Sequence, residues 1–111
     1  MSGIQNLDKI NIIKRNKIKR GIEYIIATQK DISIIKKVIV FGSSVQKNCH
    51  ESSDIDICLI SDYNTSNSLF FTIYGGLSLV MDDLCDILIY SSLSGKIKEE
   101  IDKKGVVVYE Y

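Results

Sequence analysis

The chain has 111 residues, of which 45% are apolar, and this length and composition suit one domain with a single core. Fourteen basic and fourteen acidic residues cancel, which argues against a dedicated nucleic-acid binder because such domains are usually strongly basic. The start of the chain lacks the apolar core of a signal peptide, and no apolar run approaches the roughly 18 residues of a membrane span. The three cysteines lack CxxC spacing, so we interpret them as reduced thiols of a cytoplasmic protein.

The first part of the chain, residues 1–33, is predicted to be a helical region. Apolar residues recur at helical spacing from Ile4 to Lys30, and Gly21 could divide this run into two helices. The stretch from Lys14 to Arg20 is locally basic. We interpret it as a solvated helix face, and a phosphate or nucleic-acid contact is the alternative.

The remaining residues, 34–111, alternate between strand-like and helix-like patterns. Apolar and β-branched runs, glycines and polar loops predict the following elements: a strand at 37–41, a short helix or turn at 43–48, a strand at 54–60, a polar loop at 61–68, a helix at 69–81, a strand at 85–90, a helix at 95–104 and a last strand at 106–111. This alternation predicts an α+β (mixed α/β) fold, with a mixed sheet of three to four strands and helices packed on it. We expect residues 1–111 to form one domain, with 34–111 as its core.

Two aspartates occupy the second predicted strand. Because side chains alternate across a strand, Asp54 and Asp56 share one face while their apolar neighbours take the other. Burying two adjacent carboxylates without a cation would cost several kcal/mol or would raise one pKa. Mg²⁺ removes this conflict because it is a hard cation that takes oxygen ligands. For the pair alone, a strand edge with solvated carboxylates is the alternative.

A third aspartate, Asp86, opens the next predicted strand and can join the pair if the two strands are neighbours. Three carboxylates of this kind suit a two-metal site, which clamps the attacking and leaving oxygens of an in-line displacement at phosphorus. Asp82 and Asp83 are rival candidates, ranked lower because they precede the strand. An acid that is bonded to a loop is the alternative for Asp86 by itself.

A Gly-Ser pair ends the first predicted strand. Gly42 allows backbone N–H groups to approach an anion closely, and the hydroxyl of Ser43 can donate to a phosphate oxygen. A helix N-cap is the alternative role of Ser43, and the two roles are compatible. Neither Gly-Ser nor Asp-x-Asp is specific alone. Their combination, about ten residues apart and followed by a strand acid, is specific.

The segments "FGSS", "SDIDICLI" and "CDILIY" together resemble the nucleotidyltransferase superfamily typified by DNA polymerase beta, and above all its minimal single-domain members, the MNT proteins. The resemblance covers about residues 34–111. It implies that two Mg²⁺ ions are bound by Asp54, Asp56 and Asp86. It also implies that Asp86 helps to activate an acceptor hydroxyl as a general base.

The same resemblance implies a nucleotide site at Gly42, Ser43 and Ser44, in which the first two residues hold the β and γ phosphates. The implied reaction transfers a nucleoside monophosphate, AMP from ATP, and releases pyrophosphate. Minimal members often act as antitoxins that attach AMP to a HEPN-type toxin, so the expected acceptor is a partner protein. Two alternatives are transfer to a small molecule such as an aminoglycoside, where a homo-oligomer could supply the missing wall, and a non-catalytic partner-binding module.

One part of the motif departs from the family. Many minimal members have Gly-Ser-Arg-Ala-Arg-Gly, whereas here Ser44 and Gln46 replace both arginines. A bidentate phosphate contact is therefore missing, and Lys47 supplies only a point charge. The departure leaves the choice of substrate and the rate open, but it does not remove the acids.

Overall fold

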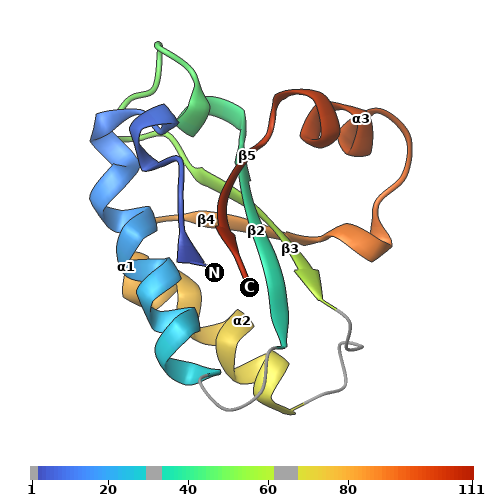
Figure 1. Ribbon diagram of the computed structural model, residues 1–111. Coiled ribbons are helices and arrows are strands. Elements are labelled where there is room, and N and C mark those ends of the chain that lie inside the picture. Colours follow the sequence, from blue (N-terminus) through green and yellow to red (C-terminus); the bar gives the residue numbers. More distant parts are fainter. Residues whose placement is uncertain (1–2, 30–33, 62–67) are drawn as a thin grey trace.

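The computed structural model describes residues 3–29, 34–61 and 68–111. A five-stranded mixed sheet forms its centre, with strand order β1-β5-β2-β3-β4 (Figure 1). In chain order the elements are β1 (Gly3–Ile4), the 3-10 helix η1 (Leu7–Lys9), α1 (Ile12–Thr28), β2 (Ile35–Phe41), the 3-10 helix η2 (Gly42–Val45), β3 (Ile55–Ser61), α2 (Ser68–Met81), β4 (Cys85–Ile89), the 3-10 helix η3 (Tyr90–Ser92), α3 (Gly95–Lys104) and β5 (Val106–Glu110). β3 and β4 run parallel, and the other neighbouring strands run antiparallel.

The predicted α+β (mixed α/β) class is confirmed, and each strand and helix predicted after residue 34 is present. The local patterns were sufficient here because these strands are rich in apolar and β-branched residues and the helices have apolar residues at helical spacing. The predicted polar loop falls mainly on residues 62–67, which lie outside the described residues.

The N-terminal region differs from the prediction of a helix that begins at Ile4. Residues Gly3 and Ile4 form β1, which pairs antiparallel with Glu110 and Tyr109 of β5. The sheet therefore has five strands and not three to four. Sequence pattern could not reveal β1, because a two-residue strand shows no alternation and is stabilised by a partner at the other end of the chain.

Gly21 does not divide the N-terminal helix, and α1 runs through it from Ile12 to Thr28. A Cβ at Gly21 would lie 2.9 Å from the Cγ and Sδ atoms of Met81 on α2. The glycine is therefore needed for the close packing of α1 against α2, which a prediction from local sequence cannot anticipate.

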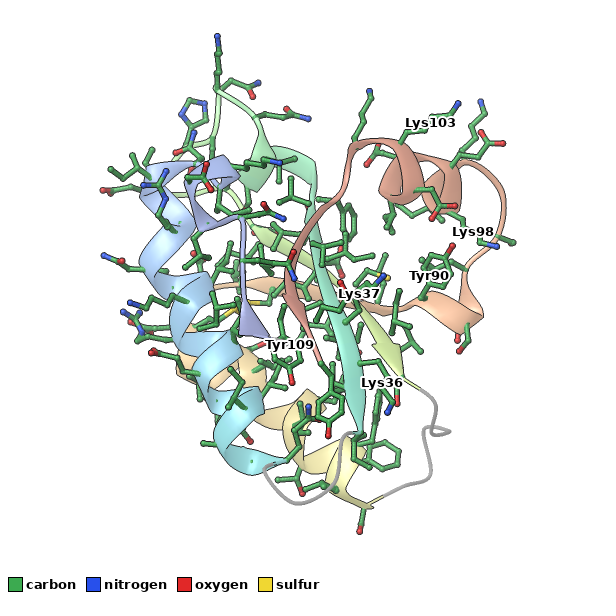
Figure 2. All side chains as sticks on the ribbon, in the orientation of Figure 1. Lys36, Lys37, Tyr90, Lys98, Lys103 and Tyr109 are labelled. Atoms are coloured by element: carbon green, nitrogen blue, oxygen red, sulfur yellow. The ribbon has the colours of Figure 1, made fainter. Side chains whose placement is uncertain are left out.

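The sheet separates two apolar clusters of different size. α1 and α2 cover one face, where the larger cluster includes Ile22, Phe70 and Tyr109. The smaller cluster lies on the other face, where Ile101 of α3 packs against Cys58 of β3 and two residues of β2. Figure 2 shows Tyr109 on the α1 side and Tyr90, Lys98 and Lys103 on the α3 side. The face under α3 is therefore the less completely covered one.

The structure also bears on the predictions about membrane spans and about the cysteines. No helix in the described parts of the chain has the length and apolar character needed to cross a bilayer. The cysteines Cys49, Cys58 and Cys85 are free, and the first two are buried. Burial, with a smaller contribution from Asp102, raises the pKa of the Cys58 thiol to about 11, so this thiol is protonated at neutral pH and behaves as a small core residue.

Candidate active site

The parallel strands β3 and β4 bring the predicted acids to one end of the sheet. Asp56 is the direct register partner of Asp86, so their backbones are one strand spacing apart, about 4.8 Å. Asp56 and Cys58 lie on the same side of β3 by alternation, which is the side that carries α3. Asp54 precedes β3 by one residue and is exposed. Asp56 and Asp86 thus occupy adjacent positions on the less covered face, and Asp54 lies near enough to Asp56 to raise the pKa of its carboxyl.

The charge around Asp56 is uncompensated. Burial raises the pKa of its carboxyl, and Asp86, Asp54 and Glu100 of α3 each raise it further. Glu100 was not among the predicted site residues. Its position is set by the packing of α3 through Ile101, and a solvated acid on an amphipathic helix gives no signal of this in the sequence.

The donor set fits a hard divalent cation. Aspartate oxygens are the ligands that Mg²⁺ prefers, and a cation would relieve the repulsion that raises the pKa of Asp56. The carboxylates adjoin one another without forming a closed cage, since no three Asp, Glu, His or Cys side chains converge within residues 3–29, 34–61 and 68–111.

The Gly-Ser turn lies directly against these acids. Gly42 has a φ of 71°, a left-handed conformation that favours glycine. A methyl group at this position would also overlap the carboxylate of Asp56. Ser43 is partly exposed, and its Oγ lies 3.5 Å from the carbonyl oxygen of Asp54. The turn and the acids are thus parts of a single site, although they come from different elements.

The two positions that replace arginines differ in exposure. Ser44 is fully buried, and its Oγ has no hydrogen-bond partner within the described residues. Its nucleotide contact stays a prediction. Gln46 is exposed and lines a cavity of about 330 Å³ together with Gly42, Val45, Glu100 and Lys104. Lys104 was not predicted as a site residue, and its positively charged side chain lines this cavity.

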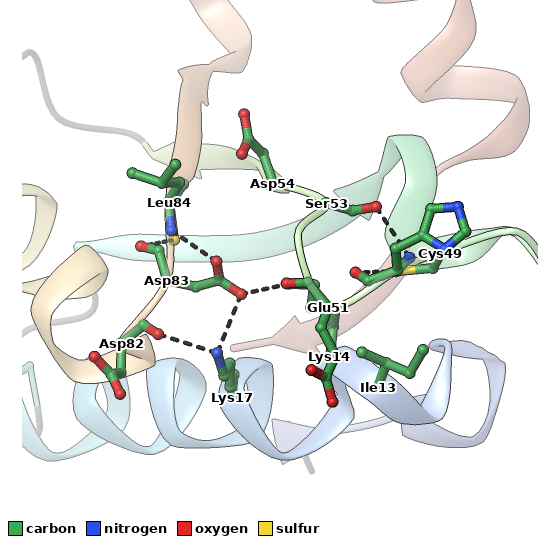
Figure 3. Close-up of polar contacts among 12 residues, drawn as sticks. Ile13, Lys14, Lys17, Cys49, Glu51, Ser53, Asp54, Asp82, Asp83 and Leu84 are labelled. Atoms are coloured by element: carbon green, nitrogen blue, oxygen red, sulfur yellow. Dashed lines mark hydrogen bonds and ion pairs between the residues drawn. The ribbon is translucent and has the colours of Figure 1, made fainter.

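The rival acid Asp83 has a different environment (Figure 3). Its Oδ2 accepts hydrogen bonds from Lys14 Nζ at 2.6 Å and Lys17 Nζ at 3.3 Å, and its Oδ1 accepts one from the Leu84 amide at 2.8 Å. Burial alone would raise the pKa of Asp83, but these hydrogen bonds outweigh it and the pKa is lowered. Asp82 is exposed and has a φ of 54° at the end of α2. Neither residue joins the group formed by Asp54, Asp56 and Asp86.

The ion pair of Asp83 also corrects the interpretation of the basic stretch. Lys14 is only 1% exposed, so it does not belong to a solvated helix face. The prediction was wrong at this residue because its partner lies 69 positions away in the sequence, beyond the reach of any local pattern.

The chain is similar to a known protein family and to several solved structures. The family described as "Polymerase beta, Nucleotidyltransferase" matches residues 20–111. No curated protein sequence matches the chain. Among solved structures, a chain in the crystal structure of a toxin–antitoxin complex with AMP-PNP aligns with a TM-score of 0.63 and 22% identity, over 86% of this chain and 73% of that one.

Two further structures have the same fold. A chain of the MntA–HepT toxin–antitoxin complex aligns with a TM-score of 0.58 and 17% identity, covering 85% of this chain and 73% of its own length. A chain of the complex between a tri-AMPylated Shewanella oneidensis HEPN toxin and its MNT antitoxin aligns with a TM-score of 0.57 and 20% identity, over 86% of this chain and 73% of that one. The chain therefore belongs to the polymerase beta nucleotidyltransferase family and is a nucleotidyltransferase with the fold of its minimal, MNT, members.

Proposed function

We propose that this enzyme transfers AMP from ATP to a hydroxyl group of a partner protein, with Mg²⁺ as cofactor. The observation that carries the proposal is the register pairing of Asp56 with Asp86, beside a glycine turn whose Cα faces the Asp56 carboxylate. Further support comes from the similarity to chains solved in complexes with AMP-PNP and with an AMPylated HEPN toxin. The free cysteines support a cytoplasmic location.

In this proposal Asp54, Asp56 and Asp86 hold two Mg²⁺ ions. Bound Mg²⁺ offsets the negative charge of the triphosphate and of the carboxylates. The acceptor oxygen attacks the α phosphorus in line, the bond from that phosphorus to the bridging oxygen of the β phosphate breaks, and pyrophosphate leaves. Asp86 takes the proton of the acceptor hydroxyl as general base. Its position on the edge strand β4 leaves it accessible to a large acceptor.

The phosphates are proposed to lie against the turn after β2. Gly42 lets the backbone approach them, and the Ser43 hydroxyl donates to a phosphate oxygen. Lys104, on the wall of the adjoining cavity, provides the positive charge that the missing arginines provide in many relatives. A lysine interacts as a point charge and not as a planar fork, which allows a looser fit to the phosphates.

The partner is proposed to be a HEPN-type protein, because the solved chains of the same fold come from toxin–antitoxin complexes. The test is incubation with α-labelled ATP and Mg²⁺, with and without a co-encoded HEPN protein. Label on that protein is expected with the native enzyme, and it is expected to disappear with the double variant Asp54→Asn/Asp56→Asn. The matched control is Asp82→Asn, which makes the same chemical change at an exposed acid outside the group.

The outcomes separate the alternatives. Label on an added aminoglycoside, with none on the protein, would replace the proposed acceptor by a small molecule. Partner binding by the native chain and the double variant alike, with no label on any acceptor, would contradict catalysis and leave a binding module. Loss of labelling in the Asp82→Asn control would contradict the assignment of the three acids.

A further inference from the structure

A buried lysine contacts the two segments that precede Asp54 and Asp86. Lys14, on the first turn of α1, is 1% exposed. Its Nζ donates to the carbonyl oxygen of Glu51 at 2.8 Å and to Oδ2 of Asp83 at 2.6 Å. Glu51 precedes Asp54 by three residues, and Asp83 precedes Asp86 by three residues. One ammonium group therefore links the two segments that lead into the proposed metal-binding strands (Figure 3).

The stability of the fold gives only a weak reason for a lysine at this position. A buried ion pair often contributes less than well-packed apolar side chains of similar volume, because two charges must be desolvated. The core on this face of the sheet is built from apolar side chains, most of them isoleucine, and methionine is similar to lysine in length and shape. The ion pair adds a geometric constraint, because its hydrogen bonds hold one carbonyl oxygen and one carboxylate at defined distances from a single nitrogen.

The strand that benefits from this constraint is β4. It has five residues and lies at the edge of the sheet, so β3 is its single neighbouring strand. The ladder between them begins where the Ile55 amide donates to the Leu84 carbonyl oxygen at 2.9 Å. The Leu84 amide in turn donates to Oδ1 of Asp83 at 2.8 Å. Lys14 thus reaches the first rung of the β3–β4 ladder through Asp83.

The start of α1 also contacts the Gly-Ser turn after β2, where the phosphates are proposed to lie. The Asn11 amide donates to the Ser44 carbonyl oxygen at 2.8 Å, and its Nδ2 donates to the Gln46 carbonyl oxygen at 2.8 Å. All three segments that carry proposed site residues are therefore attached to residues 11–14. These residues precede the region matched by the family, which begins at residue 20.

We propose that Lys14 is a positioning residue, which holds β3 and β4 so that Asp54, Asp56 and Asp86 can share one divalent cation. This inference rests on the proposed function, because it concerns the same site. It predicts that loss of Lys14 weakens metal binding more than any loss of global stability explains. The lysine itself contacts neither metal nor substrate.

The test measures Mn²⁺ binding by electron paramagnetic resonance, together with the Mg²⁺ dependence of AMP transfer. In Lys14→Met the dissociation constant for Mn²⁺ is expected to rise about tenfold or more, as for other residues that orient metal ligands. The Mg²⁺ concentration for half-maximal transfer should rise in parallel, while kcat at saturating Mg²⁺ changes less. Lys14→Arg, which keeps the charge and the donors, should restore part of the affinity.

A matched control is Gln29→Leu. Gln29 is also a buried polar residue of the α1 segment, where its side chain accepts from the Ile35 amide at 2.6 Å and donates to the Ile35 carbonyl oxygen at 2.9 Å. It ties α1 to the start of β2, away from the acids. Its loss should lower the unfolding midpoint and leave the affinity for Mn²⁺ unchanged.

If Lys14→Met does not fold, Asp83→Asn tests the same link, because an amide oxygen can still accept from Leu84 but the ion pair is lost. Unchanged affinity for Mn²⁺ in the folded variant, or an equal loss in Gln29→Leu, would overturn the positioning role and leave the proposed function intact. If the native chain bound no Mn²⁺ at all, the proposed function and this inference would both fail.

Discussion

Two groups of charged side chains lie close together at one end of β3 and β4, and their electrostatic environments are opposite. Asp83 is flanked by Lys14 and Lys17, and its pKa is lowered. Asp56 is flanked by Asp54, Asp86 and Glu100, and its pKa is raised by burial and by these neighbours. The first group is neutralised from within the protein. The second group consists of like charges, which raise the pKa of Asp56.

A structural acid and a candidate metal ligand can be distinguished by the charges that surround each of them. Both kinds are aspartates near the start of an apolar strand, so sequence context alone separates them poorly. The decisive feature is which helix faces each of them. α1 supplies lysines to Asp83, whereas α3 supplies Glu100 to Asp56.

The largest predicted effect is on catalysis. Asp56→Asn is expected to lower the rate of AMP transfer by about 10³-fold or more, because the metal site loses its central carboxylate. Its stability without metal should be equal to or higher than that of the native chain, since a repelled charge is removed. Initial rates with labelled ATP and urea unfolding measure the two effects. A stability loss without a rate loss would reverse the roles assigned to the two groups.

The second prediction concerns Asp83→Asn, which should lower the free energy of unfolding by about 3 kcal/mol. The change leaves the buried ammonium of Lys14 without its carboxylate partner. Urea unfolding with Asp82→Asn as the matched control measures the difference. Equal stability of the two variants would show that the ion pair contributes nothing beyond an ordinary surface pair.

The third prediction concerns the contact between the turn and the acids. Gly42→Ala should destabilise the fold by about 1–2 kcal/mol, because the residue has a positive φ. It should also weaken Mg²⁺ binding, because the added methyl group displaces the Asp56 carboxylate. Gly75→Ala is the control, since a Cβ there meets no atom within 4 Å. If Gly42→Ala bound Mg²⁺ with the affinity of the native chain, the contact between the turn and Asp56 would have no part in metal binding.

The smallest predicted effect is on the pH dependence of stability. The pKa of Asp83 is lower in the folded chain than its ordinary value of 3.8, so its ionised form stabilises the fold above that pH. This contribution is lost as the pH falls through the folded pKa. The stability difference between the native chain and Asp83→Asn should therefore be constant near neutral pH and shrink below about pH 3.8. A difference that persists in stronger acid would contradict ionic stabilisation.

Local patterns were enough to predict most elements. They predicted a strand that includes both Asp54 and Asp56, whereas β3 begins at Ile55 and Asp54 directly precedes it. The pairing of Asp56 with Asp86 needed one more assumption, that the two strands are parallel neighbours, and the structure has this arrangement. Their catalytic roles stay predictions until the rates are measured.

The features that sequence could not provide all depend on distant contacts. β1 is stabilised by β5 at the opposite end of the chain. The continuity of α1 at Gly21 depends on the close approach of Met81. The burial of Lys14 depends on Asp83. In each case the local sequence is compatible with another structure, and tertiary packing decides between them.

The most direct measurement is a thermal unfolding series with Mg²⁺ and a non-hydrolysable ATP analogue. A ligand that binds the folded state raises the unfolding midpoint by mass action. We predict a rise of several degrees for the native chain, a smaller rise for Asp83→Asn from a lower starting midpoint, and no rise for Asp56→Asn. An equal rise in Asp56→Asn, or no rise at all in Asp83→Asn, would contradict the account that the first group is internally compensated and the second binds the cation.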